Sequence, residues 1–324
     1  MKQIHGKDIT MKFEKIIIMG LAVLLSSGLT ATELTMTQGG GWRQLEDGGY
    51  ELNYTKGWPW LRSDVKIQPD TFYKLSWKTS STISSDRQNF VFSIQLNNPE
   101  SKGHQQYHFT KARQSETAYF YSGKNDHAVI GFYIEQLDAT GNVFVNAIHL
   151  DPVPAADLTR NLLPDGNFEQ GDGWPVNWTK GYKSTASAQI VPCTDFLSGD
   201  KCLQVDFNGK GGIQSIQLPV IPGKEFELKF WAKSPQDFVI KSFVRAWSMF
   251  GHKDDHFYKM KEIKITPEWK EYSLKLTIPD DFAKYPDLDS RLMFLSINSS
   301  GKTGRVFFND ISFRQVKNKD TQKK

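Results

Sequence analysis

Hydrophobic and polar residues alternate with a period of two through most of the chain after residue 31. In residues 224–234, Phe226, Leu228 and Phe230 fall on one side of an extended strand, and the intervening positions fall on the other. The alternation recurs in two later stretches, at Tyr272, Leu274, Leu276 and Ile278 and at Met293, Leu295 and Ile297. Turn signals rich in glycine and proline separate such stretches at short intervals. The pattern predicts an all-β fold of antiparallel β-sandwich (jelly-roll) domains.

The same pattern occurs twice, which indicates a tandem duplication. Residues 69–77 align without gaps on residues 222–230, and residues 128–150 align on residues 291–313. In the second alignment Asn146 meets Asn309 and Ala147 meets Asp310. Both matches keep their order along the chain, as two copies of one unit would.

The repeat predicts the domain boundaries. We expect a divergent β-sandwich over residues 32–152, a linker over residues 153–160, a second β-sandwich over residues 161–316 and a polar tail over residues 317–324. The sequence DPVPAAD at residues 151–157 is proline-rich and suits a short, stiff connection.

Residues 1–31 have the pattern of a secretory signal peptide. Lys12 and Lys15 precede an apolar run from residue 16 to residue 25, and small residues follow. The run is too short for a spanning helix, which needs about 20 apolar residues. The start codon could be Met1 or Met11. We expect a secreted protein, extracellular or periplasmic, with no membrane insertion after cleavage.

Composition narrows the function without naming it. Of 324 residues, 39% are hydrophobic and 13% aromatic, as in an ordinary globular protein. Lysine and arginine number 40 against 36 acidic residues, and the formal charge of +4 is spread along the chain. A nucleic-acid partner would need clustered basic residues, so nucleic-acid binding is set aside.

The two cysteines, Cys193 and Cys202, flank a Ser-Gly-Asp turn in the second unit. Two cysteines exclude a disulfide-rich scaffold and a cysteine-rich zinc site. In an oxidising compartment the pair predicts one local disulfide that closes a hairpin.

The second unit opens with NLLPDGNFEQGDGWPVNW from residue 161, continues through TPEWKEYSLKLTIP, and closes with GRVFFNDISF. In this order the three motifs resemble the carbohydrate-binding modules of families 4, 9 and 22, which are small secreted jelly rolls. The likeness covers nearly all of residues 161–316. The first unit matches only in its middle and last strands, so we interpret it as a divergent repeat. The resemblance implies a polysaccharide or oligosaccharide ligand.

The resemblance also implies a structural calcium ion between the first and last strands. The positions that match the family's ligands are Glu169 and Asp310. Calcium takes six to eight oxygen ligands, so backbone carbonyls would have to complete the set. Ala147 replaces the second carboxylate in the first unit, so no such ion is expected there.

A sugar site needs aromatic side chains for the apolar face of the ring and polar groups for its hydroxyls. Strand alternation places several residues of this kind on outward faces or in the flanking loops. Our candidates for carbohydrate binding are Trp247, Arg245, Phe243, Trp231, Trp174, Trp178, Tyr182, Tyr258 and Asn298 in the second unit and Trp58 and Trp60 in the first.

An enzyme stays an alternative at this stage. His252, Asp254, Asp255 and His256 form one dense titratable cluster, but their spacing matches no helical metal motif, and a solvated loop is the simpler interpretation. A glycosidase needs two carboxylates across a cleft, which a β-sandwich can provide. No nucleophile elbow or phosphate-binding loop occurs in the sequence.

The sequence therefore predicts a secreted, monomeric, non-catalytic polysaccharide-binding protein. The alternatives are a glycoside hydrolase or lyase on the same scaffold, and a cell-surface structural or adhesion protein.

Overall fold

The structure is a computed structural model. It describes residues 32–83, 90–98, 103–109, 116–135, 138–170, 173–181, 183–195, 199–245, 258–280 and 291–317, and for residues 103–109, 243–245 and 258 it describes the backbone alone. The predicted signal peptide lies outside these residues, as does the histidine-containing cluster at residues 252–256. No helix in the described part of the chain is long and apolar enough to cross a membrane.

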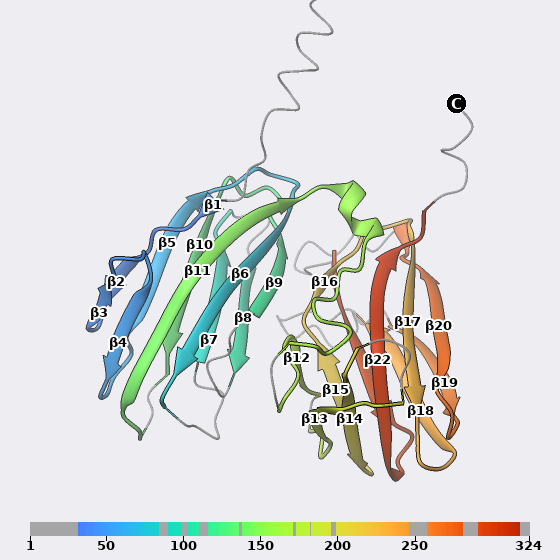
Figure 1. The fold of residues 1–324 in the computed structure, drawn as a ribbon. Helices are drawn as coiled ribbons and strands as arrows, with labels where there is room; N and C mark the ends of the chain where they lie inside the picture. The colour runs from blue at the N-terminus through green and yellow to red at the C-terminus, as the bar shows by residue number, and fades with distance from the viewer. Residues whose placement is uncertain are drawn as a thin grey trace, which may run out of the picture. The chain divides into compact units, whose positions relative to one another are not determined.

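The first unit is a sandwich of two antiparallel sheets (Figure 1). One sheet has the order β2 (Thr37–Gly39), β5 (Trp60–Lys66), β10 (His127–Ile134), β7 (Phe90–Leu96), β8 (Gly103–Phe109). The other has the order β3 (Trp42–Gln44), β4 (Tyr50–Tyr54), β11 (Gly141–Val153), β6 (Phe72–Ser81), β9 (Glu116–Tyr121), and β1 (Thr32–Glu33) also pairs with β11.

The second unit repeats this plan. One sheet has the order β12 (Trp178–Lys180), β15 (Gly212–Ser215), β21 (Leu292–Ser299), β18 (Phe238–Arg245), β19 (Tyr258–Ile265), and β16 (Leu218–Pro219) also pairs with β21. The other has the order β13 (Ser187–Pro192), β14 (Lys201–Asn208), β22 (Thr303–Gln315), β17 (Glu225–Lys233), β20 (Lys270–Thr277). The predicted all-β tandem sandwich is thereby confirmed.

The two units have the same connectivity. From β2 to β11 and from β12 to β22, leaving out β16, the chain visits the two sheets in one order, and each strand takes the equivalent place. The sheet with β21 in the second unit thus corresponds to the sheet with β10 in the first. This agreement supports the duplication that the sequence predicted.

A shared irregularity makes the correspondence exact to the residue. The register between β11 and β6 shifts between Asn146 and His149, and the register between β22 and β17 shifts between Lys229 and Trp231. At each shift one residue has left-handed backbone, with φ of 48° at Ala147 and 47° at Asp310. These are the positions that the sequence alignment equates, so both copies carry the same β-bulge.

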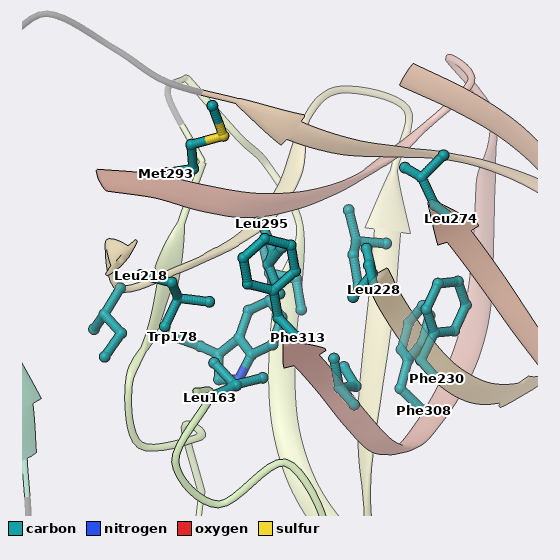
Figure 2. Packing of buried hydrophobic residues seen from close by; sticks show 14 of the residues in the cluster. Leu163, Trp178, Leu218, Leu228, Phe230, Leu274, Met293, Leu295, Phe308 and Phe313 are labelled. Carbon is teal, nitrogen blue, oxygen red and sulfur yellow. The ribbon is translucent and has the colours of Figure 1, made fainter. Parts of the chain in front are cut away.

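Each sandwich encloses an apolar core formed by the inward residues of its strands. In the first unit the Trp77 and Phe92 rings stack with their centroids 4.0 Å apart. In the second, the predicted alternation in β17 holds, since Phe226, Leu228 and Phe230 are buried and the residues between them are half-buried. Figure 2 shows Leu228, Phe230 and Phe308 within this core.

The predicted linker contains one short 3-10 helix, η1 (Ala155–Thr159). Its Leu158 side chain is fully buried and belongs to the same apolar cluster as Phe308 and Phe313. The connection is therefore held by packing as well as by its prolines.

The predicted disulfide is wrong, because Cys193 and Cys202 are free thiols in this structure. Cys202 lies opposite Val191 in the β13–β14 ladder, so Cys193 is its diagonal neighbour. Diagonal Cα atoms lie roughly 7–8 Å apart, whereas a disulfide usually needs about 4.4–6.8 Å. Both thiols are buried, and burial raises the pKa of each above its ordinary value.

The shared bulge generates a stability prediction. Left-handed backbone costs a residue with a Cβ roughly 1–2 kcal/mol, and glycine avoids this cost but loses more chain entropy on folding. We expect Ala147→Gly to raise the free energy of unfolding by about 0.5–1 kcal/mol, measured by urea denaturation. Ala156→Gly, at an exposed position of η1, is the control and should lower the free energy of unfolding. Equal destabilisation by both substitutions would contradict this account of the bulge.

Candidate carbohydrate-binding face

The outer face of the sheet with β21 gathers polar side chains from all five strands of its main path. The inward residues of β21, Met293, Leu295 and Ile297, are buried in the core, so the alternate residues point outward. Of these, Phe294 and Ser296 are themselves covered from solvent and Asn298 is half-buried. We call this surface the β21 face and define it by the described residues Thr179, Gln214, Lys241, Met260, Glu262, Phe294, Ser296 and Asn298.

Backbone register arranges these residues in rows that cross the sheet. In one row Thr179 pairs with Gln214, and Gln214 pairs with Ser296. In the next row Lys241 lies between Asn298 on β21 and Glu262 on β19. Hydroxyl, amide, ammonium and carboxylate groups thus lie side by side, as the hydroxyl groups of a sugar chain require.

The side chains of the β21 face already engage one another. The Asn298 Nδ2 group donates to the Ser296 hydroxyl at 3.3 Å, and the Lys241 ammonium lies 3.3 Å from the Glu262 carboxylate. Beside Asn298 two glycines let the backbone pack closely, since the Gly181 amide donates to the Gly212 carbonyl at 2.9 Å and a Cβ atom on Gly212 would overlap the Ile297 carbonyl. The arrangement is a polar, partly pre-organised surface.

Three predicted site residues, Phe243, Arg245 and Tyr258, lie on this sheet, and the structure describes their backbone alone. Phe243 pairs with Ser296 and Met260, and Arg245 pairs with Phe294 and Tyr258, so all three predicted positions fall in rows of the β21 face. Two others, Trp247 and Tyr182, lie outside the described residues.

Trp178 is a core residue, which corrects its prediction as an exposed rim aromatic. Its side chain is 0% exposed, and Figure 2 shows it among Leu163, Leu218 and Phe313. The outward position of short strand β12 belongs to Thr179 instead. Trp174 is half-buried against the same core, and its Nε1 group donates to the Trp178 carbonyl at 2.7 Å.

Trp231 lies on the opposite sheet from Asn298, so these two predicted carbohydrate-binding residues do not share one face. It belongs to β17 and pairs with Glu271 on β20. There it lines a pocket of about 470 Å³ together with Lys229, Arg314 and Asp310. Lys229 forms an ion pair with Glu271 at 2.9 Å in this pocket.

Of the two predicted calcium ligands, Glu169 accepts a hydrogen bond from the Lys201 backbone, and Asp310 directly follows a residue that donates to it. Glu169 Oε1 accepts the backbone amides of Asp200 at 3.0 Å and Lys201 at 3.2 Å. The Lys201 carbonyl accepts a hydrogen bond from Asn309, the residue before Asp310. Within the described ranges no three histidine, cysteine or acidic side chains form a cluster that could hold a metal.

Asp165 supplies a further carboxylate in the pocket that Asp310 lines. Asp165 lines the same pocket as Asp310, and its Oδ2 atom is buried without a hydrogen-bond partner in the described part of the chain. Burial raises the pKa of this carboxyl group, against the lowering effect of the Gln170 and Glu169 amides. An uncompensated carboxylate oxygen of this kind is a donor that suits a hard cation.

The two predicted aromatic residues of the first unit are exposed. The side chains of Trp58 and Trp60 are 60% and 41% exposed, and Trp60 is the first residue of β5. β5 belongs to the sheet that corresponds to the one bearing the β21 face.

Comparison with known proteins assigns the second unit to a family. A family model described as a carbohydrate binding domain matches residues 160–288. The match confirms the resemblance drawn from the sequence for the second half of the chain, which carries a domain of this family. No curated protein matches the chain.

Solved structures with a similar fold include carbohydrate-binding modules. The chain is similar to the N-terminal CBM22-1-CBM22-2 tandem domain of Paenibacillus barcinonensis Xyn10C, at 14% identity and a TM-score of 0.36, over 88% of this chain and 95% of that one. It is also similar to the CBM22-1 xylan-binding domain of the same protein (15%, 0.37, over 47% and 92%) and to a family 16 carbohydrate binding module (17%, 0.34, over 47% and 99%). At such low TM-scores the family assignment rests on the sequence match.

Sequence reasoning missed Thr179 and Gln214, which lie on strands of three and four residues. Alternation cannot be recognised over so few positions. The signal that could have found them is the pairing of β12 with β15 and of β15 with β21, which only the folded sheet supplies.

The different placement of two tryptophans predicts different costs of truncation. Trp178→Ala removes a fully buried indole and should lower the free energy of unfolding by about 3–5 kcal/mol. Trp231→Ala, on a half-buried outer face, should cost clearly less. Chemical denaturation of the two variants measures both values. Similar losses from both would contradict the assignment of Trp178 to the core.

Proposed function

We propose that the protein is a secreted, non-catalytic polysaccharide-binding protein and that the β21 face is a binding surface for the glycan chain. The observation that carries the proposal is the pair of adjacent rows on this face, in which amide, hydroxyl and charged groups of five strands point outward together. The family of the second unit supports a carbohydrate as the ligand.

The chemistry of the face suits sugars. A pyranose ring presents hydroxyl groups at its edge and C–H groups on its face, and these call for hydrogen-bonding side chains beside apolar ones. The half-buried side chains of Gln214 and Asn298 provide donors and acceptors, and the exposed Met260 side chain provides apolar surface.

Binding without cleavage is favoured by the charges on the face. Among the eight residues that define it, Glu262 is the single carboxylate, and it forms an ion pair with Lys241. Glycoside hydrolysis usually requires two carboxyl groups placed on either side of the bond. Secretion is supported by the leader pattern of residues 1–31.

Two lysines on opposite sheets of the second unit form a matched test. Lys241 on the β21 face and Lys229 on the other sheet are 33% and 30% exposed, and each pairs with a glutamate. Affinity electrophoresis through gels containing xylan, mannan, a β-1,3-glucan or a mixed-linkage β-glucan measures retention of the full mature chain. We expect Lys241→Ala to weaken binding to the best retained polysaccharide roughly fivefold, about 1 kcal/mol, and Lys229→Ala to leave it unchanged.

The same samples decide between binding and catalysis. Reducing sugars are measured in the supernatant after incubation with each polysaccharide. Retention without released sugar is the expected result. Release that disappears in a Glu262→Gln variant would replace the proposal with a glycosidase, and a larger loss from Lys229→Ala than from Lys241→Ala would move the site to the other sheet.

We also propose that Glu169 and Asp310 contribute to a structural calcium site, with backbone carbonyls completing the ligand set. The support is the family of this unit, the hydrogen bond from the Lys201 amide to Glu169, and the bond from Asn309, the residue before Asp310, to the Lys201 carbonyl. Bound calcium would neutralise these carboxylates and join the opening segment to β22.

Calcium binding predicts a stability increment. An ion that binds only the folded state stabilises it by about 2.7 kcal/mol at a free concentration a hundredfold above its dissociation constant. Adding calcium to chelator-treated protein should therefore raise the melting temperature, and Asp310→Asn should remove the effect. Asp138→Asn, an exposed carboxylate of the first unit, is the control and should keep it. No shift in the wild-type protein would refute the calcium site.

A further inference from the structure

We propose that the first unit carries a second, independent polysaccharide site, in which the Trp60 indole stacks against a sugar ring. The inference rests on the proposed polysaccharide-binding function but concerns a separate surface. The family match covers residues 160–288 and does not extend to this unit.

The location follows from topology. Trp60 lies on β5, and β5 occupies in its sheet the place that β15 occupies in the sheet of the β21 face. Leu61 and Ser63 are buried beneath the sheet, so Trp60, Arg62 and Asp64 lie on its outer side. The duplicated fold thus presents an equivalent outer face in both units, and in the first unit this face carries an exposed tryptophan.

The exposure of this region is unusual within the described residues. The large hydrophobic side chains classed as exposed there are Trp58, Trp60 and Met260. Met260 belongs to the β21 face, and the two tryptophans lie two positions apart on the equivalent sheet or at its margin. An exposed indole leaves costly apolar surface in water, and such surface commonly marks a binding site.

Trp60 is also held in place. Its neighbour across the β2–β5 ladder is Gly39, and a Cβ atom on Gly39 would overlap the indole ring. The ring therefore covers the bare backbone of the edge strand. The preceding Pro59 is fixed on both sides, since its carbonyl accepts the Ile134 amide at 3.2 Å and its Cα lies against Gly40. A platform that is ordered before binding avoids an entropic cost when the ligand arrives.

Polar groups adjoin the platform. Tyr133 pairs with Trp60 across β10, and Arg62 and Asp64 follow it along the outer side of β5. An aromatic plane beside a guanidinium, a carboxylate and a phenol offers stacking and hydrogen bonds to one sugar chain.

The size of the apolar patch favours a sugar over a protein partner. A specific protein interface buries roughly 800 Å² on each side, whereas one tryptophan side chain contributes about 150–250 Å². Two partly exposed indoles fall well short of an interface but match the faces of one or two sugar rings.

The experiment compares four substitutions in the full mature chain. Trp60→Ala removes the platform, and Gly39→Ala keeps the tryptophan but displaces its ring. Arg62→Ala removes a neighbouring polar group on the same face. Arg43→Ala, on β3 of the other sheet, is the matched control because this arginine is also exposed. Binding is measured by affinity electrophoresis with the same four polysaccharides, in the wild-type and Lys241→Ala backgrounds.

We expect Trp60→Ala and Gly39→Ala each to weaken binding roughly tenfold, which corresponds to about 1.4 kcal/mol. Arg62→Ala should weaken it less, and Arg43→Ala should leave it unchanged. In the Lys241→Ala background the remaining retention should depend on Trp60. Tryptophan fluorescence should shift on adding the polysaccharide to wild-type protein and shift less in Trp60→Ala.

Other outcomes overturn the inference in distinguishable ways. If Lys241→Ala abolishes retention and Trp60→Ala does not alter it, the second site is absent while the proposed function stands. If the wild-type chain is retained by none of the polysaccharides, both fail together. If sedimentation shows a wild-type dimer that Trp60→Ala dissociates, with retention unaltered, the patch is a protein contact instead.

Discussion

Face-to-face packing of two antiparallel sheets governs everything else in this protein. Side chains alternate between the two faces of each strand, so burying one face in a shared core directs the other face away from that core. In β17 the inward residues are buried and the alternate residues are half-buried, whereas in β21 the outward residues Phe294 and Ser296 are buried as well. The outer faces are therefore free to vary in chemistry without disturbing the core, and recognition can be placed on them.

The β-bulge in each unit shows how closely the two copies share this frame. Register shifts occur at equivalent positions of β11 and β22, and equivalent residues, Ala147 and Asp310, adopt left-handed backbone. Alanine at such a position gains nothing from its side chain, whereas aspartate lines a pocket with Asp165. We interpret the bulge as a property of the fold. The second copy places a carboxylate, that of Asp310, at this position.

Alternation in the sequence was sufficient to predict the β-sandwich class, the duplication and the inward residues of β17. It was insufficient to predict which sheet each strand joins. β17 and β18 are consecutive in the chain but belong to opposite sheets, and β18 pairs with β21. Trp231 on β17 and Asn298 on β21 therefore lie on different surfaces. Short strands gave no usable pattern, which is why Trp178 was expected outside and Thr179 was overlooked. The cysteine spacing suggested a disulfide because the sequence does not reveal the register of the β13–β14 ladder. That register makes Cys193 and Cys202 diagonal neighbours.

The central claim is that a glycan lies on the β21 face and leaves the opposite sheet of that unit uncovered. Hydrogen exchange followed by mass spectrometry tests it directly, with the full chain in the presence and absence of an oligosaccharide from the best retained polysaccharide. The account predicts added protection in peptides that cover β18, β19 and β21, with β17, β20 and β22 unchanged. Protection confined to β17, β20 and β22 would contradict it.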